Sequence, residues 1–245
     1  MSVPRFCVSL ALAPGRVGET IELPDAVAHH AVRVTRLVVG DALTLFTGEG
    51  GEYASTIARI DKRGAAVRID RYDAIERESA LPITLAQAIA ATDAMDYAVR
   101  KATELGAAAI APVVTARSAP LPSGTRGERR HAHWREIAVA ACEQCGRNRI
   151  PDVASPVALS AWLAGWQGDG AVLDPTAERS LAALSAPKLP FAVLIGPEGG
   201  LAPAEIAAAK RAGFAGVRFG PRVLRTETAG VAVLAAMQAM WGDMQ

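Results

Sequence analysis

Apolar and polar residues follow a period of two in the first third of the chain. Between residues 41 and 72 this alternation predicts three strands, separated by turns at GEGGE and DKRG. Before them, residues 25–37 predict one helix, with Asp25 as its N-cap and Gly40 after its end. Strands of this kind close most naturally as a small barrel or curled sheet. Residues 1–75 are therefore predicted to form a β-rich domain.

From residue 83 onward the pattern changes to alternating strands and helices. Helices are predicted over 93–106, 126–146, 202–213 and 226–241, the last capped by Thr226. Short apolar strands are predicted over 83–90, 108–115, 170–174, 191–196 and 216–220. This alternation is typical of an α/β domain with a parallel sheet covered on both faces. Because the polar segment 73–82 separates the two patterns, the second domain is predicted to span residues 80–245.

The amino-acid composition is that of an ordinary globular protein and excludes few classes of protein. The chain has 245 residues, 51% of them apolar and 21% charged, and its net charge is +1. This near-neutral balance gives no global electrostatic preference for nucleic acid or for a membrane. We find no apolar run long enough to span a membrane and no secretory signal. Three cysteines form no disulfide framework, so a cytoplasmic protein is expected.

The loop after the strand at 191–196 reads GPEGG and precedes a helix. Its spacing fits neither common phosphate-binding pattern, and Glu198 would repel a phosphate. A neutral or cationic ligand such as S-adenosylmethionine suits the loop better. The alternative is a tight strand-to-helix connection that needs glycine only for its backbone conformation.

A second loop, GPRVLRTETAG at 220–230, also lies between a strand and a helix. Arg222 and Arg225 lie beside the start of that helix, where anions are favoured. They could bind an RNA phosphate or stabilise an anion formed in a reaction. Alternatively, they form a surface pair with Glu198 or Glu227.

Five ordered segments resemble the bacterial 16S rRNA N3-uridine methyltransferases of the SPOUT superfamily. They read HHAVRVTRLVVGD, KATELGAAAIAPVVTARS, ACEQCGRNRIP, IGPEGGLAPAEI and FGPRVLRTETA, and together they extend over almost the whole chain. One departure is Thr35, which stands where leucine is usual. The resemblance implies a PUA-like β-barrel over 1–75 and a SPOUT α/β domain with a C-terminal trefoil knot over 80–245.

The resemblance also implies that S-adenosylmethionine lies in the knot, held by three loops through their backbone. The implied cofactor-binding residues are Leu173, Ile195, Gly196, Gly199, Gly200, Phe219, Gly220, Val223 and Leu224. It further implies a homodimer that methylates N3 of a uridine in 16S rRNA, near the decoding site of the assembled small ribosomal subunit. No membrane or metal partner is expected.

Methyl transfer to N3 of uridine requires loss of the imide proton. We predict that Arg225 stabilises the resulting negative charge and that Glu198 or Glu227 accepts the proton. For RNA contacts the basic stretch 117–149 is a candidate, although such stretches are often only solvated helix faces. The predicted RNA-binding residues are Arg33, Arg36, Lys62, Arg63, Arg117, Arg147 and Arg222.

Two other classes of protein remain as alternatives: a phosphate-binding α/β enzyme, and a non-catalytic RNA-binding or assembly factor. The acidic loop counts against the first, and the intact glycines of both loops count against the second. Cys142 and Cys145 have the spacing of a metal or redox pair, but no second pair accompanies them, so neither role is predicted.

Overall fold

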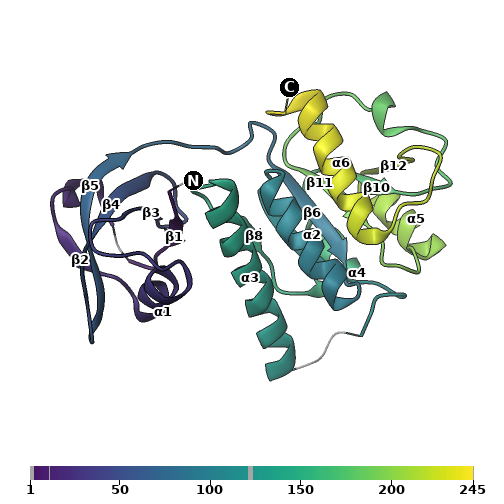
Figure 1. Cartoon of the computed structure of the whole chain (residues 1–245). Helices are drawn as coiled ribbons and strands as arrows, with labels where there is room; N and C mark the ends of the chain where they lie inside the picture. The colour runs from purple at the N-terminus through teal and green to yellow at the C-terminus, as the bar shows by residue number, and fades with distance from the viewer. Residues whose placement is uncertain (1–2, 11, 121–123, 245) are drawn as a thin grey trace. The chain divides into compact units, whose positions relative to one another are not determined.

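The computed structural model describes residues 3–10, 12–120 and 124–244. The chain divides into two compact units that do not match a single cut in the sequence (Figure 1). The N-terminal unit contains Met1–Glu78 and also Cys142–Ile150, whereas the C-terminal unit contains Ser79–Ala141 and Pro151–Gln245. No helix of the described residues is long and apolar enough to cross a membrane.

The N-terminal unit is built on a five-stranded sheet of order β1-β3-β4-β5-β2. Its strands are β1 (Arg5–Cys7), β2 (Thr20–Glu22), β3 (Ala42–Phe46), β4 (Glu52–Asp61) and β5 (Gly64–Asp73). β1 pairs in parallel with β3, and the other pairs are antiparallel. Alternate residues of β4, Tyr53, Ser55 and Ile57, are buried, which is the period-two pattern that predicted the strand. The three predicted strands are confirmed, while the short edge strands β1 and β2 were not predicted.

The helix predicted over 25–37 is shorter than expected. It consists of α1 (Asp25–His29) and a π-helical turn, η2 (His30–Val34). The N-cap position is Pro24, so the prediction of Asp25 as the N-cap was wrong. Arg36 then adopts a φ of 61°, which ends the helical path before Leu37. Three β-branched residues at 32, 34 and 35 also disfavour a longer helix.

The C-terminal unit contains a seven-stranded sheet of order β12-β10-β11-β6-β7-β8, with β9 pairing to β7. Its strands are β6 (Ile83–Ala88), β7 (Ala109–Val114), β8 (Asp152–Val153), β9 (Val157–Ala158), β10 (Asp169–Leu173), β11 (Phe191–Ile195) and β12 (Phe214–Val217). Every pairing in this sheet is parallel, as predicted. The strand predicted over 216–220 begins and ends earlier, because Phe214 and Val217 are the side chains that the core buries.

Helices cover both faces of this sheet, as the alternation predicted. They are α2 (Thr92–Glu104), α3 (Thr125–Cys145), α4 (Leu159–Gly165), α5 (Pro203–Arg211) and α6 (Thr226–Trp241), with a 3₁₀ turn at η3 (Leu181–Ala183). A second 3₁₀ turn, η1 (Pro14–Arg16), lies in the N-terminal unit. On one face, Ala86 and Ala88 of β6 pack in a cluster with α4 and α5. On the other, α6 lies close to the sheet at Gly230, and α2 lies along α6 (Figure 1). Thr226 is the first residue of α6, and Arg225 occupies the N-cap position predicted for it.

Candidate functional site

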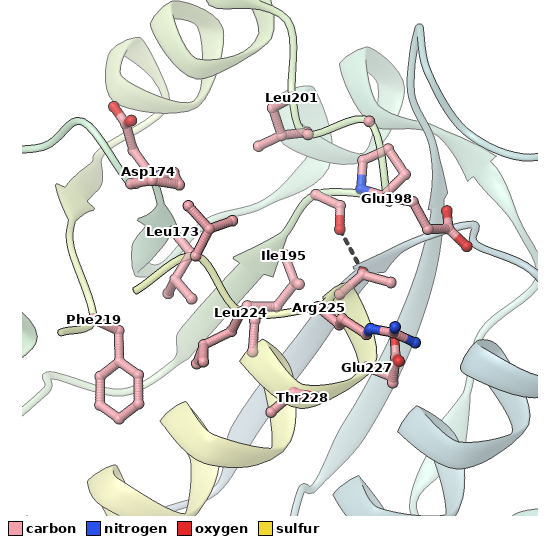
Figure 2. Close-up of a pocket in the computed structure, with 18 of the residues that line it drawn as sticks. Leu173, Asp174, Ile195, Glu198, Leu201, Phe219, Leu224, Arg225, Glu227 and Thr228 are labelled. Carbon is pink, nitrogen blue, oxygen red and sulfur yellow. Dashed lines mark hydrogen bonds between the residues drawn. The ribbon is translucent and has the colours of Figure 1, made fainter. Parts of the chain in front are cut away.

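A large pocket lies where three neighbouring strands of the C-terminal unit end. β12, β10 and β11 are adjacent and parallel, so their carboxyl ends meet at one edge of the sheet. The loops that follow them line a cavity of about 1260 Å³, shown in part in Figure 2. Ligands of parallel sheets bind at this edge. All three loops singled out from the sequence are thus brought together.

The predicted cofactor-binding residues all line this cavity. Leu173 and Ile195, the last residues of β10 and β11, and Leu224 of the loop before α6 supply apolar side chains (Figure 2). Leu201 adds a fourth from the start of the α5 segment and was not predicted. The walls are therefore suited to a flat apolar ring, with backbone groups of the loops available for its polar edge.

The three glycines of the GPEGG loop meet two physical requirements. Gly200 has a φ of 69°, which side-chain-bearing residues rarely adopt. A Cβ at Gly196 would lie 3.0 Å from the backbone nitrogen of Leu201, and one at Gly199 would lie 3.3 Å from Cβ of Arg117. The loop therefore depends on glycine both for its conformation and for close packing.

Glu198 binds a backbone group outside its own loop. Its Oε1 accepts a hydrogen bond of 2.7 Å from the backbone N–H of Ala91. Ala91 is the N-cap residue of α2, where free N–H groups favour a carboxylate. The acidic side chain of the loop thus braces the loop against the start of another helix.

A buried chain of hydrogen bonds ties the same loop to the start of α6. The hydroxyl of Thr226 donates to the carbonyl of Gly196 over 2.6 Å (dashed in Figure 2), and Gln87 Nε2 donates to that hydroxyl over 2.8 Å. Gln87 was not singled out from the sequence. Its signal was available, because it is an amide side chain near the end of a largely apolar strand.

Arg222 and Arg225 line the pocket, and both side chains are exposed. Among the residues that the structure describes, no ion pair joins either arginine to Glu198 or Glu227. Arg225 also occupies the N-cap position of α6, whose N–H groups favour an anion. Both arginines therefore line the cavity, and the ion pairs that the alternative interpretation required are not observed among the described residues.

The other predicted RNA-binding residues are in different settings. Arg117 lines the pocket and donates to the carbonyl of Gly199 over 2.9 Å. Four others are exposed in the N-terminal unit: Arg33, Arg36, Lys62 and Arg63. Arg147 is only 4% exposed, and its Nε donates to Glu78 over 3.0 Å. Such burial disfavours an RNA contact for Arg147 and indicates a structural role.

The cysteines provide no reactive thiol pair. Burial raises the pKa of Cys142 to about 12, so this thiol stays protonated at neutral pH. A protonated, buried thiol is a poor nucleophile and a poor metal ligand.

The fold and the pocket together define an α/β class of protein with a large ligand site at the carboxyl edge of a parallel sheet. Comparison with known families narrows this class. The family described as "RNA methyltransferase domain" matches residues 77–238, and the one described as "RNA methyltransferase PUA domain" matches residues 23–70.

Curated relatives and solved structures agree with these family matches. A protein of Synechocystis named ribosomal RNA small subunit methyltransferase E is 33% identical over 94% of this chain and 77% of its own. A structure of the same-named protein from Neisseria gonorrhoeae, bound to S-adenosyl methionine, is 35% identical, covers 100% of both chains and superposes with a TM-score of 0.92. A methyltransferase structure from Legionella pneumophila, also with that cofactor, is 34% identical over 99% of this chain and all of its own, with a TM-score of 0.94. The chain belongs to the RNA methyltransferase family.

Proposed function

We propose that this protein transfers a methyl group from S-adenosylmethionine to N3 of a uridine in 16S rRNA, acting in the cytoplasm. The observation that carries the proposal is the meeting of three loops in one pocket of an RNA methyltransferase fold. Two of the relatives described above are named ribosomal RNA small subunit methyltransferase E. We infer that the substrate is the assembled small subunit and that the uridine lies near its decoding site.

The residues of the pocket fit S-adenosylmethionine. Leu173, Ile195 and Leu224 suit an adenine ring, while the glycine loop exposes backbone for its polar groups. No lysine is among the described residues that line the cavity, and Glu198 disfavours a phosphate. Bound there, S-adenosylmethionine would supply an electrophilic methyl group. In keeping with the family resemblance, we propose that these loops form a trefoil knot.

The chain's own groups have two tasks in this reaction. First, the pocket must hold the base and the cofactor in line, which alone can contribute a large part of the rate. Second, the imide must lose its N3 proton. Arg225 is exposed to the cavity and can stabilise the negative charge on the base. Because Oε1 of Glu198 is already bonded to Ala91, Glu227 is the better-placed proton acceptor.

We further propose a homodimer formed through α6. Large apolar side chains are exposed on and next to this helix and on α2: Met240 is 36% exposed, Met244 44% and Tyr97 41%. Because α2 and α6 lie against each other, these side chains can contribute to one apolar patch, and contiguous apolar patches are typical of an interface. Sedimentation at several protein concentrations tests this, and a fully active monomer would contradict it.

Transfer of a labelled methyl group provides the test of function. Small subunits from a strain that lacks the modification, and free 16S rRNA, are incubated with the protein and labelled S-adenosylmethionine. Digestion to nucleosides and mass spectrometry should show N3-methyluridine, more with subunits than with free rRNA. Binding of the subunits without any transfer would instead support the non-catalytic assembly factor. Methylation at another atom would retain the enzyme class and reject the uridine N3 assignment.

A further inference from the structure

We propose that Arg117 positions the glycine loop for the cofactor, as part of a clamp formed by the turn Thr115–Ser118. This inference rests on the proposed use of S-adenosylmethionine. From the sequence, Arg117 was a candidate RNA contact; its hydrogen bond assigns it a second task.

The turn Thr115–Ser118 is hydrogen-bonded to the segment after β11 at two residues, Gly199 and Glu205. Arg117 Nη1 donates to the carbonyl of Gly199 over 2.9 Å. One residue earlier, the backbone N–H of Ala116 donates to Oε1 of Glu205 over 2.8 Å, and Oε2 of that carboxylate accepts from Ala202 over 2.8 Å. One short turn therefore holds both the glycine loop and the first turn of α5.

The turn itself is well fixed. The hydroxyl of Ser118 accepts from the backbone N–H of Thr115 over 3.0 Å and lies 2.9 Å from the hydroxyl of Thr115. The next residue, Ala119, donates its N–H to Ile89 over 3.1 Å. Because the turn directly follows β7, an inner strand of the sheet, it is a firm support rather than a mobile arm.

The opposite side of the loop is held by Glu198, which accepts from the N–H of Ala91. The carbonyl that Arg117 binds belongs to the Gly199–Gly200 peptide, whose N–H donates to the carbonyl of Pro197 over 2.8 Å. These two bonds together hold a peptide between two glycines, which would otherwise be unusually free to rotate. Arg117 fixes the direction of its carbonyl. Without that bond the loop would sample other conformations, and the cofactor would have to order it on binding.

An arginine suits this position because only one of its three nitrogens is needed to donate to the carbonyl of Gly199. The guanidinium group has five N–H donors, and the side chain is exposed at the rim of the pocket. The bond to Gly199 therefore leaves donors available for an RNA phosphate. Measuring cofactor affinity without RNA separates the positioning task from RNA binding.

The test compares Arg117→Ala, Arg117→Lys and the control Arg100→Ala, which removes an exposed charge on α2 outside the pocket. S-adenosylmethionine affinity is measured by calorimetry in the absence of RNA. Loss of one hydrogen bond from a charged donor predicts a fall of about tenfold for Arg117→Ala. Lysine should restore part of the affinity, because its ammonium can still donate to the carbonyl, and Arg100→Ala should match the wild type.

A second readout is hydrogen exchange at the amides of Gly200 and Leu201 in the cofactor-free protein. Exchange should be faster in Arg117→Ala and close to wild type in Arg117→Lys. Should alanine at 117 destabilise the whole fold, Glu205→Gln tests the other grip, and it should also weaken cofactor binding. Unchanged cofactor affinity in folded Arg117→Ala and Glu205→Gln, with or without weaker RNA binding, would overturn the clamp. Failure of the wild-type protein to bind S-adenosylmethionine would overturn the proposed function itself.

Discussion

At the scale of single residues, Gly200 is the most demanding position of the cofactor loop. Its φ of 69° is in the left-handed region, and a Cβ placed there would meet no protein atom within 4 Å. Substitution by valine should therefore strain the backbone by about 1–2 kcal/mol or more, without a steric clash at Cβ. We expect Gly200→Val to fold and to lose S-adenosylmethionine binding, as measured by calorimetry.

Gly213 offers a matched control for this substitution. Its φ is 93°, its Cβ position is equally open, and it lies outside the pocket. Gly213→Val should lower the melting temperature and leave cofactor affinity within about twofold. If both variants bind the cofactor equally well, the glycine loop is not part of the cofactor site.

Arg225 is expected to act in the reaction rather than in cofactor binding. Arg225→Ala should keep S-adenosylmethionine affinity within a few-fold, while methyl transfer falls by roughly two orders of magnitude. Single-turnover kinetics with saturating cofactor give this rate directly. Arg211→Ala, an exposed arginine at the end of α5, should transfer methyl groups normally. Near-normal turnover of Arg225→Ala would mean that the imide anion is stabilised by another group.

The local pattern of apolar and polar residues predicted most of the helices and strands. It did not predict contacts between residues that are far apart in the sequence. Two loops of the pocket were predicted from the sequence itself, because strand, loop and helix follow one another there. The role of the loop after Leu173 in binding the cofactor was predicted only from the family resemblance. By contrast, Glu205 reaches Ala116 and Gln87 reaches Thr226 across long separations that no local period encodes. The ends of elements were also poorly predicted, since Arg36 ends a helix through a backbone conformation that non-glycine residues rarely adopt.

At the scale of elements, the start of β4 is stabilised by a charged network within the N-terminal unit. Glu52 accepts hydrogen bonds from Arg5, Arg77 and Asn148. Burial alone would raise the pKa of Glu52, but the hydrogen bonds from Arg77, Arg5 and Asn148 outweigh it and lower the pKa from 4.5 to about 2. The ionised form is therefore the one that the folded state prefers.

The sign of this shift predicts how stability depends on pH. Because the folded pKa is depressed, the contribution of Glu52 is complete above pH about 4.5 and is lost as the pH falls toward about 2. A shift of this size corresponds to about 3 kcal/mol. Denaturant unfolding of the wild type and Glu52→Gln should show that the variant is less stable near neutral pH and loses less stability in acid. Equal losses in acid would show that another group titrates.

At the scale of the whole molecule, the two units are expected to divide the work. A chain that starts near residue 80 retains every residue of the pocket and should bind S-adenosylmethionine and dimerise. It should bind ribosomal RNA more weakly, and the lost part should be salt-sensitive because it consists of phosphate contacts. Affinities for both ligands, measured at two salt concentrations, test this. RNA binding as tight as that of the full chain would assign the RNA contacts to the basic stretch 117–149 instead.

In the same shortened chain, residues 142–150 lose the unit to which they belong. Removal of residues 1–79 deletes the partners of Asn148 and Arg147, among them Glu52 and Glu78. Both residues are buried in the full chain. Residues 142–150 should therefore become accessible to proteases, and resistance of this segment to cleavage in the shortened chain would contradict the network described for it.

The N-terminal unit is built from two separate segments of the chain, and these segments are not synthesised one directly after the other. The ribosome releases residues 1–78 well before residues 142–150, and residues 79–141 of the C-terminal unit emerge between them. The five strands can pair early, but Arg5 and Glu52 acquire Asn148 as a partner only after the chain has been made past that point. The N-terminal unit therefore cannot finish folding before residues 79–141 of the C-terminal unit have been made, and the synthesis of the two units is interleaved.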